Sequence, residues 1–266
     1  MLVKEVFGID KPIIGMCHLQ PLPGDPLYDD QKGLKSIIES ARNDLRSLIK
    51  GGVDAVMFSN EFSLPYLTEV EVITVATMAR IIGELMEDIT IPFGVDVLWD
   101  PIKTFDLAKA VSAAFVREVF TGVYASDYGL WNTNYGQTAR HKHQVVADSV
   151  FTLFNIFPES ALYLSNRSIA DIAKSTVFNN KPDAICVSGL TAGVPTDNQT
   201  LQIVKKAVKD TPVFVNTGVN PSNVEEQIKI ADGCIVGTYF KKDGKFENAV
   251  DYDRVRYFMD IANQLR

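Results

Sequence analysis

Polar side chains stand at or just past the ends of several short apolar runs in this sequence. A polar group at the end of a buried strand is costly unless it is paired or faces an opening at the edge of the sheet. These residues are therefore the first candidates for a functional site. They are His18, Asn60, Asp96, Arg117, Asn155, Ser188 and Asn216.

Asp96 is the candidate general acid or base of this set. A carboxylate beside Arg117 would be kept ionised by the guanidinium, or would have its pKa tuned by burial. Arg117 would serve equally well to bind a carboxylate or a phosphate of a substrate. His18 is a candidate catalytic partner. The alternative is that Asp96 and Arg117 form a structural ion pair that only fills the interior.

Two more carboxyl groups lie close to these positions in the sequence. Glu61 follows Asn60 and is a weaker acid/base candidate. Glu118 has the opposite strand parity to Arg117, so we expect it to face the layer of helices.

Two glycine turns near the end of the chain predict a phosphate site. Segments 213–222 and 230–241 each give an apolar strand followed by a glycine turn, at Gly218 and at Gly237. Glycine lets backbone N–H groups approach an anion without a Cβ in the way, and a helix N-terminus adds donors and a favourable dipole. Lys241 or Lys242 would add positive charge. The candidate phosphate-binding residues are Gly218, Val219, Gly237, Thr238, Ser188 and Gly189. The alternative is that these glycines only make tight turns.

The elements that must position these groups alternate between short apolar runs and longer amphipathic segments. The continuous, β-branched runs are typical of strands covered on both faces. We expect strands at 13–19, 55–58, 91–98, 115–120, 150–157, 184–187, 213–215 and 234–236. We expect helices at 33–50, 68–87, 102–113, 168–177, 200–209, 221–230 and 253–265.

This alternation over 266 residues predicts a single (β/α)₈ TIM barrel spanning 1–266. An open, doubly wound sheet is the alternative. Two connections are long: the proline-rich segment 20–28, and the aromatic-rich segment 122–140 that contains Asp127. Long loops in compact domains are often functional. We expect 124–135 to lie over the barrel mouth, with Asp127 joining Asn60, Asn155 and Asn216 as substrate-binding residues.

Composition excludes several other classes of protein. The net charge of −7 disfavours nucleic acid as a partner, and no apolar run approaches the ~18 residues of a membrane span. The N-terminus does not resemble a secretory signal, and Cys17, Cys186 and Cys234 are too far apart in the sequence to suggest a disulfide framework. We therefore expect a cytoplasmic protein with reduced thiols. A homo-oligomer is an open possibility.

No sequence pattern indicates a metal or an organic cofactor. His141 and His143 are two positions apart and do not share a helix face, so we expect solvated helix residues rather than metal ligands. A divalent ion beside Asp96 is still an alternative. No lysine stands at the end of the sixth strand, which argues against Schiff-base chemistry.

The chain resembles the BtpA/SgcQ family from about residue 11 to 261. The resemblance rests on the stretch 14–24 with its Leu-Pro-Gly end, the Asp-Tyr-Gly at 127–129, and segments 51–55, 187–195, 217–224 and 231–238. It implies a phosphate-binding barrel. One branch of the family is named for photosystem I biogenesis, and another for its place beside sugar-phosphate metabolism genes.

The sequence departs from the family pattern after the fifth strand. Asn155, Phe157, Glu159 and Ser160 stand where many relatives carry Asp, His, Lys and His, and Asn132 replaces a loop acid. The leading hypothesis is an enzyme that acts on a small phosphorylated metabolite, a sugar or nucleoside phosphate, by isomerase- or lyase-type proton transfer. The rival is a non-catalytic barrel that binds a metabolite or assists assembly, which the altered fifth-strand residues favour.

Overall fold

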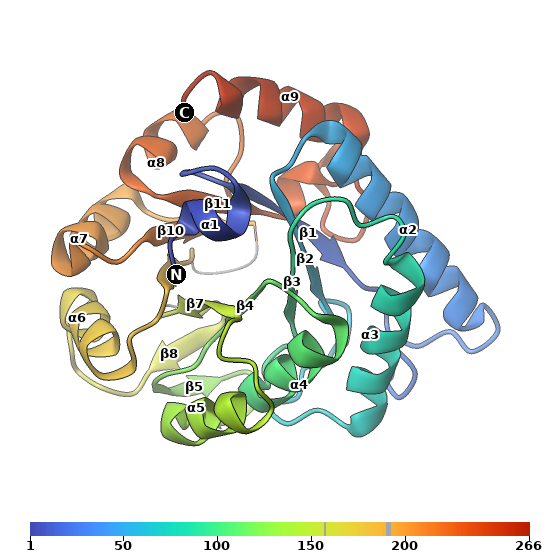
Figure 1. Ribbon diagram of the computed structural model, residues 1–266, viewed down its shortest axis with the longest axis horizontal. Helices are drawn as coiled ribbons and strands as arrows, with labels where there is room; N and C mark the ends of the chain where they lie inside the picture. Colours follow the sequence, from blue (N-terminus) through green and yellow to red (C-terminus); the bar gives the residue numbers. More distant parts are fainter. Residues whose placement is uncertain (157, 190–192) are drawn as a thin grey trace.

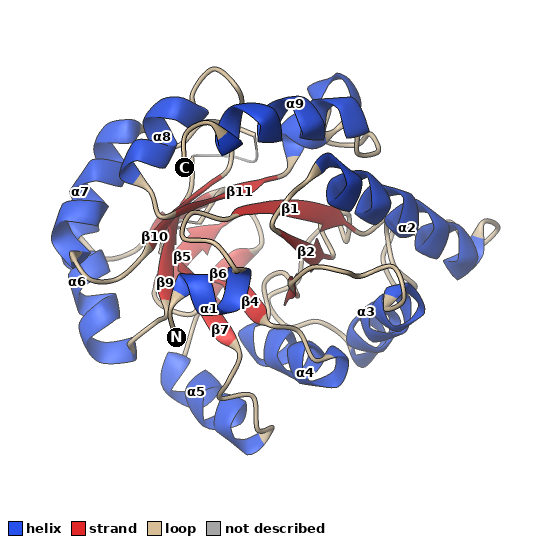
Figure 2. Cartoon of the chain, turned by 45° about the horizontal axis from the view of Figure 1, so that its top comes forward, coloured by secondary structure: helices blue, strands red, loops and turns tan. Residues whose placement is uncertain are grey.

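The computed structural model describes residues 1–156, 158–189 and 193–266. Within these ranges, eight parallel strands close into a barrel that is surrounded by a ring of helices (Figures 1 and 2). The strands follow the order of the chain around the barrel, and β1 pairs with both β2 and β11. The predicted (β/α)₈ barrel is confirmed, and the open sheet is excluded.

Each barrel strand lies where an apolar run predicted it. The barrel strands are β1 (Ile13–His18), β2 (Ala55–Ser59), β3 (Phe93–Asp96), β4 (Phe115–Glu118), β7 (Phe151–Asn155), β9 (Ala184–Val187), β10 (Val213–Asn216) and β11 (Gly233–Val236). The main helices are α2 (Gly33–Gly51), α3 (Val72–Leu85), α4 (Pro101–Val111), α5 (Tyr135–Gln144), α6 (Ile169–Asn180), α7 (Asn198–Val208), α8 (Val224–Ile230) and α9 (Tyr252–Asn263).

The alternation of each strand divides the core into two layers. Phe58 and Val95 belong to the large apolar cluster between strands and helices, while Phe115, Phe151 and Phe214 belong to a smaller cluster inside the barrel. Counting in steps of two from the inner residues leads to a polar residue at the C-terminal end of most strands. The same periodicity that builds the inner core therefore turns these polar side chains toward the barrel mouth.

A short helix that the sequence analysis did not predict closes the other end of the barrel. Helix α1 (Val3–Phe7) lies across the barrel centre in Figure 1. The Phe7 ring lies 5.0 Å from the ring of Phe115, 5.6 Å from Phe151 and 6.2 Å from Phe214, measured between centroids. The N-terminal end is thus filled with aromatic side chains, and the C-terminal end is left for the site.

The long fourth connection is not the loop that the sequence suggested. It forms the hairpin β5 (Val123–Ser126) and β6 (Gly129–Asn132), which joins β8 (Ala161–Tyr163) in a three-stranded antiparallel sheet. Its aromatic residues pack on Trp99, just past β3, with the Trp131 and Trp99 rings 4.7 Å apart. The hairpin therefore lies on the C-terminal side of the barrel. Asp127 occupies its exposed turn.

Helix α8 begins at Val224, three residues later than predicted. The side chain of Asn220 accepts a hydrogen bond from the Ser222 amide at 2.9 Å, and Asn223 accepts one from the Asn220 amide at 2.9 Å. These local bonds hold the Asn-Pro-Ser segment in a turn and delay the helix. Two 3₁₀ turns, η1 (Thr238–Phe240) and η2 (Lys242–Gly244), follow β11.

The described helices include none that is both long and apolar enough to cross a membrane. Cys17, Cys186 and Cys234 are buried free thiols. His141 is hydrogen-bonded to Asp106 at 2.6 Å, and His143 to Asp148 at 2.8 Å.

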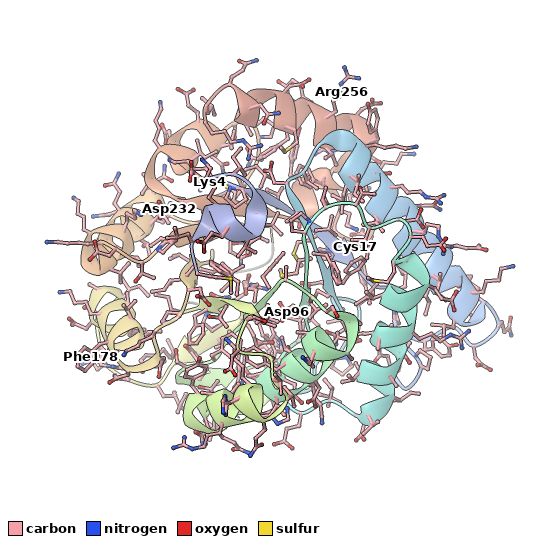
Figure 3. All side chains as sticks on the ribbon, in the orientation of Figure 1. Lys4, Cys17, Asp96, Phe178, Asp232 and Arg256 are labelled. Atoms are coloured by element: carbon pink, nitrogen blue, oxygen red, sulfur yellow. The ribbon has the colours of Figure 1, made fainter. Side chains whose placement is uncertain are left out.

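The aromatic plug predicts a large difference between two phenylalanine substitutions. Phe7→Ala should lower the free energy of unfolding by about 3–5 kcal/mol, because the inner rings lose a buried partner and a cavity forms. Phe178→Ala is the matched control, since Phe178 on α6 is 82 % exposed at the edge of the molecule (Figure 3). Urea unfolding of both variants measures the difference. Equal, small losses would show that α1 does not seal the barrel.

Candidate functional site

A cavity of about 50 Å³ opens at the C-terminal end of the barrel. Every loop that contributes to it leaves the C-terminal end of a strand, as in other barrels of this architecture. Its polar wall comes from β1, β4, β10 and the segments that follow β2, β7 and β11. The lining residues include Met16, His18, Glu61, Arg117, Glu159, Gly193, Asn216, Thr217, Gly218, Ile235, Gly237, Thr238 and Phe246.

Arg117 is the central charge of the cavity floor. Its Nη1 donates to Oδ2 of Asp96 at 3.1 Å, and its Nη2 lies 3.6 Å from Oε1 of Glu159. Asn216 donates to the same Glu159 oxygen at 3.4 Å. Burial disfavours the guanidinium charge, but Glu159 and Asp96 outweigh it and raise the pKa of Arg117. The guanidinium is therefore ionised and fixed between two carboxylates.

Asp96 lies beneath Arg117 rather than in the cavity wall. It is fully buried, near the barrel centre in Figure 3, and burial raises its pKa to about 6 although Arg117 opposes the shift. Burial and the Asp96 charge together raise the pKa of Glu118 well above its usual range. The expectation that Glu118 faces only the helix layer is corrected here, since its carboxyl group interacts with Asp96. Glu118 is the last residue of β4, where the strand alternation ceases to fix its direction.

Glu61 is the carboxyl group that faces the cavity with a pKa near neutrality. Burial is the largest cause that raises its pKa to about 7, against the lowering effects of Arg117 and of a hydrogen bond from Ser59. The Ser59 hydroxyl donates to Oε2 of Glu61 at 3.0 Å. A carboxyl group with this pKa can both accept and donate a proton at pH 7.

His18 is a buried, neutral imidazole in the same wall. Burial, and then the positive charges of Lys241 and Arg117, lower its pKa well below the usual value. Among the described residues, its Nδ1 has no hydrogen-bond partner. The ring sits beside Phe62 and Phe246, with centroids 6.2 and 5.3 Å away.

Asn216 joins the cavity to a polar chain inside the barrel. Its Nδ2 donates to Oγ of Ser188 at 2.8 Å, and Ser188 donates to Oδ1 of Asn155 at 3.3 Å. Asn60 instead accepts a hydrogen bond from the Leu98 amide at 2.8 Å and ties the end of β2 to that of β3. The structure thus brings Asn216 to the cavity, and leaves Asn60, Asn155, Ser188 and the exposed Asp127 outside its wall.

Residues of the two glycine turns line the same cavity: Gly218, Gly237 and Thr238 line it, and Val219 lines only the adjoining groove. In the part of the chain that the structure describes, no group accepts a hydrogen bond from the amides of Gly218, Val219, Gly237 or Thr238. The Gly189 amide differs, because it donates to the Thr217 hydroxyl at 2.7 Å. Among the described residues, four amides of this region therefore have no acceptor within the protein, whereas the Gly189 amide has one.

Each glycine of this pair also has a steric role. Gly218 has φ +63°, and a Cβ there would lie 2.2 Å from the Pro195 nitrogen. At Gly237 a Cβ would lie 3.2 Å from the His18 ring. Gly237 therefore makes room for the imidazole as well as exposing its own amide.

Lys241, predicted to add positive charge beside the glycine turns, does not line the cavity. Its Nζ donates to Oδ2 of Asp44 on α2 at 2.9 Å, and the side chain is 1 % exposed. Asp44 also accepts from the Val250 amide at 2.8 Å. The ion pair anchors the segment after β11 to α2, so the charge of Lys241 is paired within the protein. Lys242 is exposed.

Sequence reasoning missed several residues of the cavity. Glu159 and Phe246 follow β7 and β11, and Thr217 stands between two recognised positions. The position of Glu159 in the segment that departs from the family pattern was the available signal. Phe157 of that segment, like 190–192 of the 187–195 match, lies outside the described residues. Among the described residues, no three His, Cys, Asp or Glu side chains form a group that could hold a metal ion.

An α/β barrel with polar groups gathered at the C-terminal end of its strands defines an enzyme-like architecture. The BtpA family model matches residues 9–264, and the chain belongs to the BtpA family. It is 61 % identical to the sgc region protein SgcQ of Escherichia coli (strain K12), over 99 % of this chain and 98 % of that protein. It is 30 % identical to the photosystem I biogenesis protein BtpA of Synechocystis sp., over 96 % of this chain and 89 % of the relative. The resemblance stated from the sequence is confirmed.

Solved structures with low sequence identity share the fold. A structure described as native KDPGal has a TM-score of 0.57 at 13 % identity, covering 97 % of each chain. Phosphoribosyl anthranilate isomerase from Thermus thermophilus has a TM-score of 0.55 at 9 % identity, covering 96 % of this chain and all of that one. At these identities the comparison shows the barrel alone.

The buried pair predicts a stability effect at Asp96. Asp96→Asn should lower the free energy of unfolding by about 3–5 kcal/mol, because Arg117 would lose a buried charge partner. Glu225→Gln is the control: it breaks an exposed ion pair with Lys229 and should leave the free energy of unfolding nearly unchanged. Urea unfolding at pH 8, where Asp96 is ionised, measures both. An unchanged midpoint for Asp96→Asn would refute the structural role.

Proposed function

We propose that this protein is an enzyme that acts on a small phosphorylated metabolite by proton transfer, in the manner of an isomerase or lyase. The observation that carries the proposal is the juxtaposition, at one opening, of unpaired backbone donors with the Glu61 carboxyl group. The first suit a phosphate, and the second suits acid–base catalysis at neutral pH.

The amides of Gly218, Val219, Gly237 and Thr238 would hold the phosphate. Several backbone N–H groups that converge without partners form a preorganised anion site. They need no side-chain charge, which agrees with the engagement of Lys241 by Asp44. The phosphate would anchor the ligand at the β10–β11 side and direct the rest of it toward β1, β2 and β4.

Glu61 would move the proton and Arg117 would stabilise the charge that develops. Glu61 has a pKa of about 7, so a substantial fraction is ionised and able to accept a proton from carbon. The Arg117 guanidinium, fixed by Asp96 and Glu159, would stabilise an enolate oxygen without reorganisation. Neutral His18 can donate or accept a hydrogen bond at the same intermediate. Asp96 then acts as a positioning residue for Arg117.

The non-phosphate end of the substrate should be rich in hydroxyl groups. Glu61 and Glu159 present acceptor oxygens to the cavity, and Arg117 already has two carboxylate partners. A substrate carboxylate would meet this negative charge, whereas hydroxyl groups would donate to it. A sugar phosphate fits this pattern better than a sugar-acid phosphate.

The rival function is ligand binding without catalysis, possible for a barrel of the family that includes a photosystem I biogenesis protein. The Arg117–Glu159 contact is the observation that favours it, because a guanidinium between two carboxylates has less charge to offer a reaction. The pKa of Glu61 favours the enzyme, since a purely binding site has no need of a group that titrates near pH 7.

Phosphate binding predicts a specific set of perturbed amide resonances. Titration of ¹⁵N-labelled protein with inorganic phosphate should shift the backbone amides of Gly218, Val219, Gly237 and Thr238, because anion hydrogen bonds deshield the bound N–H groups. The Gly189 amide, already bonded to Thr217, should shift less. Sodium chloride at equal ionic strength is the control. Shifts spread over the surface, or none at the four amides, would contradict the phosphate site.

Proton transfer predicts a loss of turnover in Glu61→Gln. The substitution keeps the side-chain volume and removes the titrating group, so turnover should fall by about 10²–10⁴-fold with phosphate binding retained. The assay is exchange of carbon-bound hydrogen in D₂O, followed by NMR over a panel of sugar phosphates. The wild-type rate should rise through pH 7 as Glu61 ionises.

The control for this variant is Glu247→Gln, an exposed change on the same side of the barrel. It should leave exchange unaltered. Wild-type exchange on no sugar monophosphate or sugar diphosphate, together with intact phosphate binding, would favour the non-catalytic rival.

A further inference from the structure

A second, outer groove adjoins the proposed phosphate cradle, by which we mean the backbone amides of Gly218, Val219, Gly237 and Thr238. It is bounded by the turn after β10, by η1 and by α9, and it contains Val219, Pro221, Tyr239, Arg254 and Tyr257 in its lining. Its volume is about 480 Å³, against about 50 Å³ for the inner cavity. The inference drawn from it rests on the proposed function and concerns the class of substrate.

The cradle lies at the neck between the two spaces. Gly193, Gly218 and Thr238 line both the inner cavity and the outer groove. A phosphate held by the Gly218 and Thr238 amides therefore has room on two sides. One side leads to Glu61 and Arg117, and the other leads to Arg254.

Arg254 is held in the groove with part of its guanidinium free. Its Nε donates to the Tyr239 carbonyl oxygen at 2.7 Å, and its Cζ lies 4.3 Å above the Tyr239 ring. In the described part of the chain, neither Nη1 nor Nη2 of Arg254 has a hydrogen-bond or ion-pair partner. A half-buried guanidinium that is fixed through Nε and stacked on an aromatic ring presents its outer edge for bidentate contact with an anion.

The Tyr239 carbonyl oxygen also connects Arg254 to the segment that forms part of the cradle. Tyr239 belongs to η1, the same turn whose first residue, Thr238, supplies a cradle amide. Arg254 therefore anchors to the segment that holds the inner phosphate, and its free edge lies in the space next to that phosphate. An anionic group directly bonded to the inner phosphate would extend into the groove that Arg254 lines.

We propose that the ligand carries two linked phosphates, a diphosphate ester, with the inner phosphate in the amide cradle and the outer one on Arg254. The inner phosphate is bonded to the organic group that enters the barrel. A phosphomonoester would fill the cradle and leave the Arg254 guanidinium without a partner. The diphosphate uses both.

The test compares two inorganic probes by isothermal titration calorimetry, in the absence of divalent metal. Wild-type protein should bind pyrophosphate at least 10-fold more tightly than orthophosphate. Arg254→Gln should weaken pyrophosphate binding by about 10–100-fold, the range for a lost charged hydrogen bond, and change orthophosphate binding by less than 2-fold. Arg254→Lys should retain part of the preference, because it keeps the charge without the bidentate edge.

Arg256→Gln is the matched control. Arg256 lies two residues away on α9, at the outer edge of the molecule in Figure 3, and its side chain bonds only to Tyr252 at 3.3 Å among the described groups. It should bind both probes like the wild type. Melting temperatures of all variants establish that they are folded.

Other outcomes separate this inference from the function on which it rests. Equal loss of both probes in Arg254→Gln would place Arg254 on the cradle phosphate and overturn the diphosphate. Orthophosphate binding without a preference for pyrophosphate in the wild type would also overturn it, and would leave the proposed function standing. If neither orthophosphate nor pyrophosphate binds, both the diphosphate inference and the proposed function are overturned. The wild-type comparison needs no variant, so a poorly folded Arg254→Gln does not prevent the decision.

Discussion

The buried contact between Arg117 and Asp96 determines how the mouth of this barrel is organised. A guanidinium inside an apolar barrel is tolerable only with a carboxylate partner, and Asp96 provides one at 3.1 Å from the neighbouring strand. Once Arg117 is fixed and charged, Glu159 is drawn toward it, and Asn216 completes the contact. The position of the segment after β7 relative to β4 and β10 therefore depends on one cation. The strands supply the geometry, and this charge selects which loop residues approach the centre.

The carboxyl groups around this cation differ in pKa, chiefly through burial and secondarily through the charges beside them. Asp96 and Glu159 contact Arg117 directly, whereas Glu118 interacts with Asp96 and gains a raised pKa from burial and from that negative neighbour. Glu61 is farther out and is left with a pKa of about 7. Asp96, Glu118 and Glu61, three acids of ordinary intrinsic pKa, thus come to differ through burial and through their charged neighbours. The protein thereby has a carboxyl group, that of Glu61, with a pKa near neutral pH at the opening of the barrel.

Much of the fold could be predicted because each barrel strand is a continuous apolar run, whereas the site depended on contacts that no local pattern encodes. The sequence placed His18 and Asp96 at strand ends, and both are the last residues of barrel strands, because the end of a strand follows from a local apolar run. Strand parity failed for Glu118, because its carboxyl group interacts with Asp96 on the neighbouring strand. It also gave no means of knowing that Lys241 meets Asp44, 197 positions away. The hairpin at 123–132 was missed because its strands are short and only one face is buried.

Helix α1 has a consequence for traffic through the molecule. The aromatic rings of Phe7, Phe115, Phe151 and Phe214 pack together and fill the N-terminal end of the barrel, so in the described part of the chain the cavity opens toward the C-terminal end. A ligand that enters the cavity beside the glycine turns must also leave there, because the aromatic rings fill the other end of the barrel. Entry and departure are therefore mutually exclusive events, and a molecule that lingers in the cavity excludes its successor. The rate at which a bound molecule leaves the cavity then sets an upper limit on the rate at which further molecules can bind.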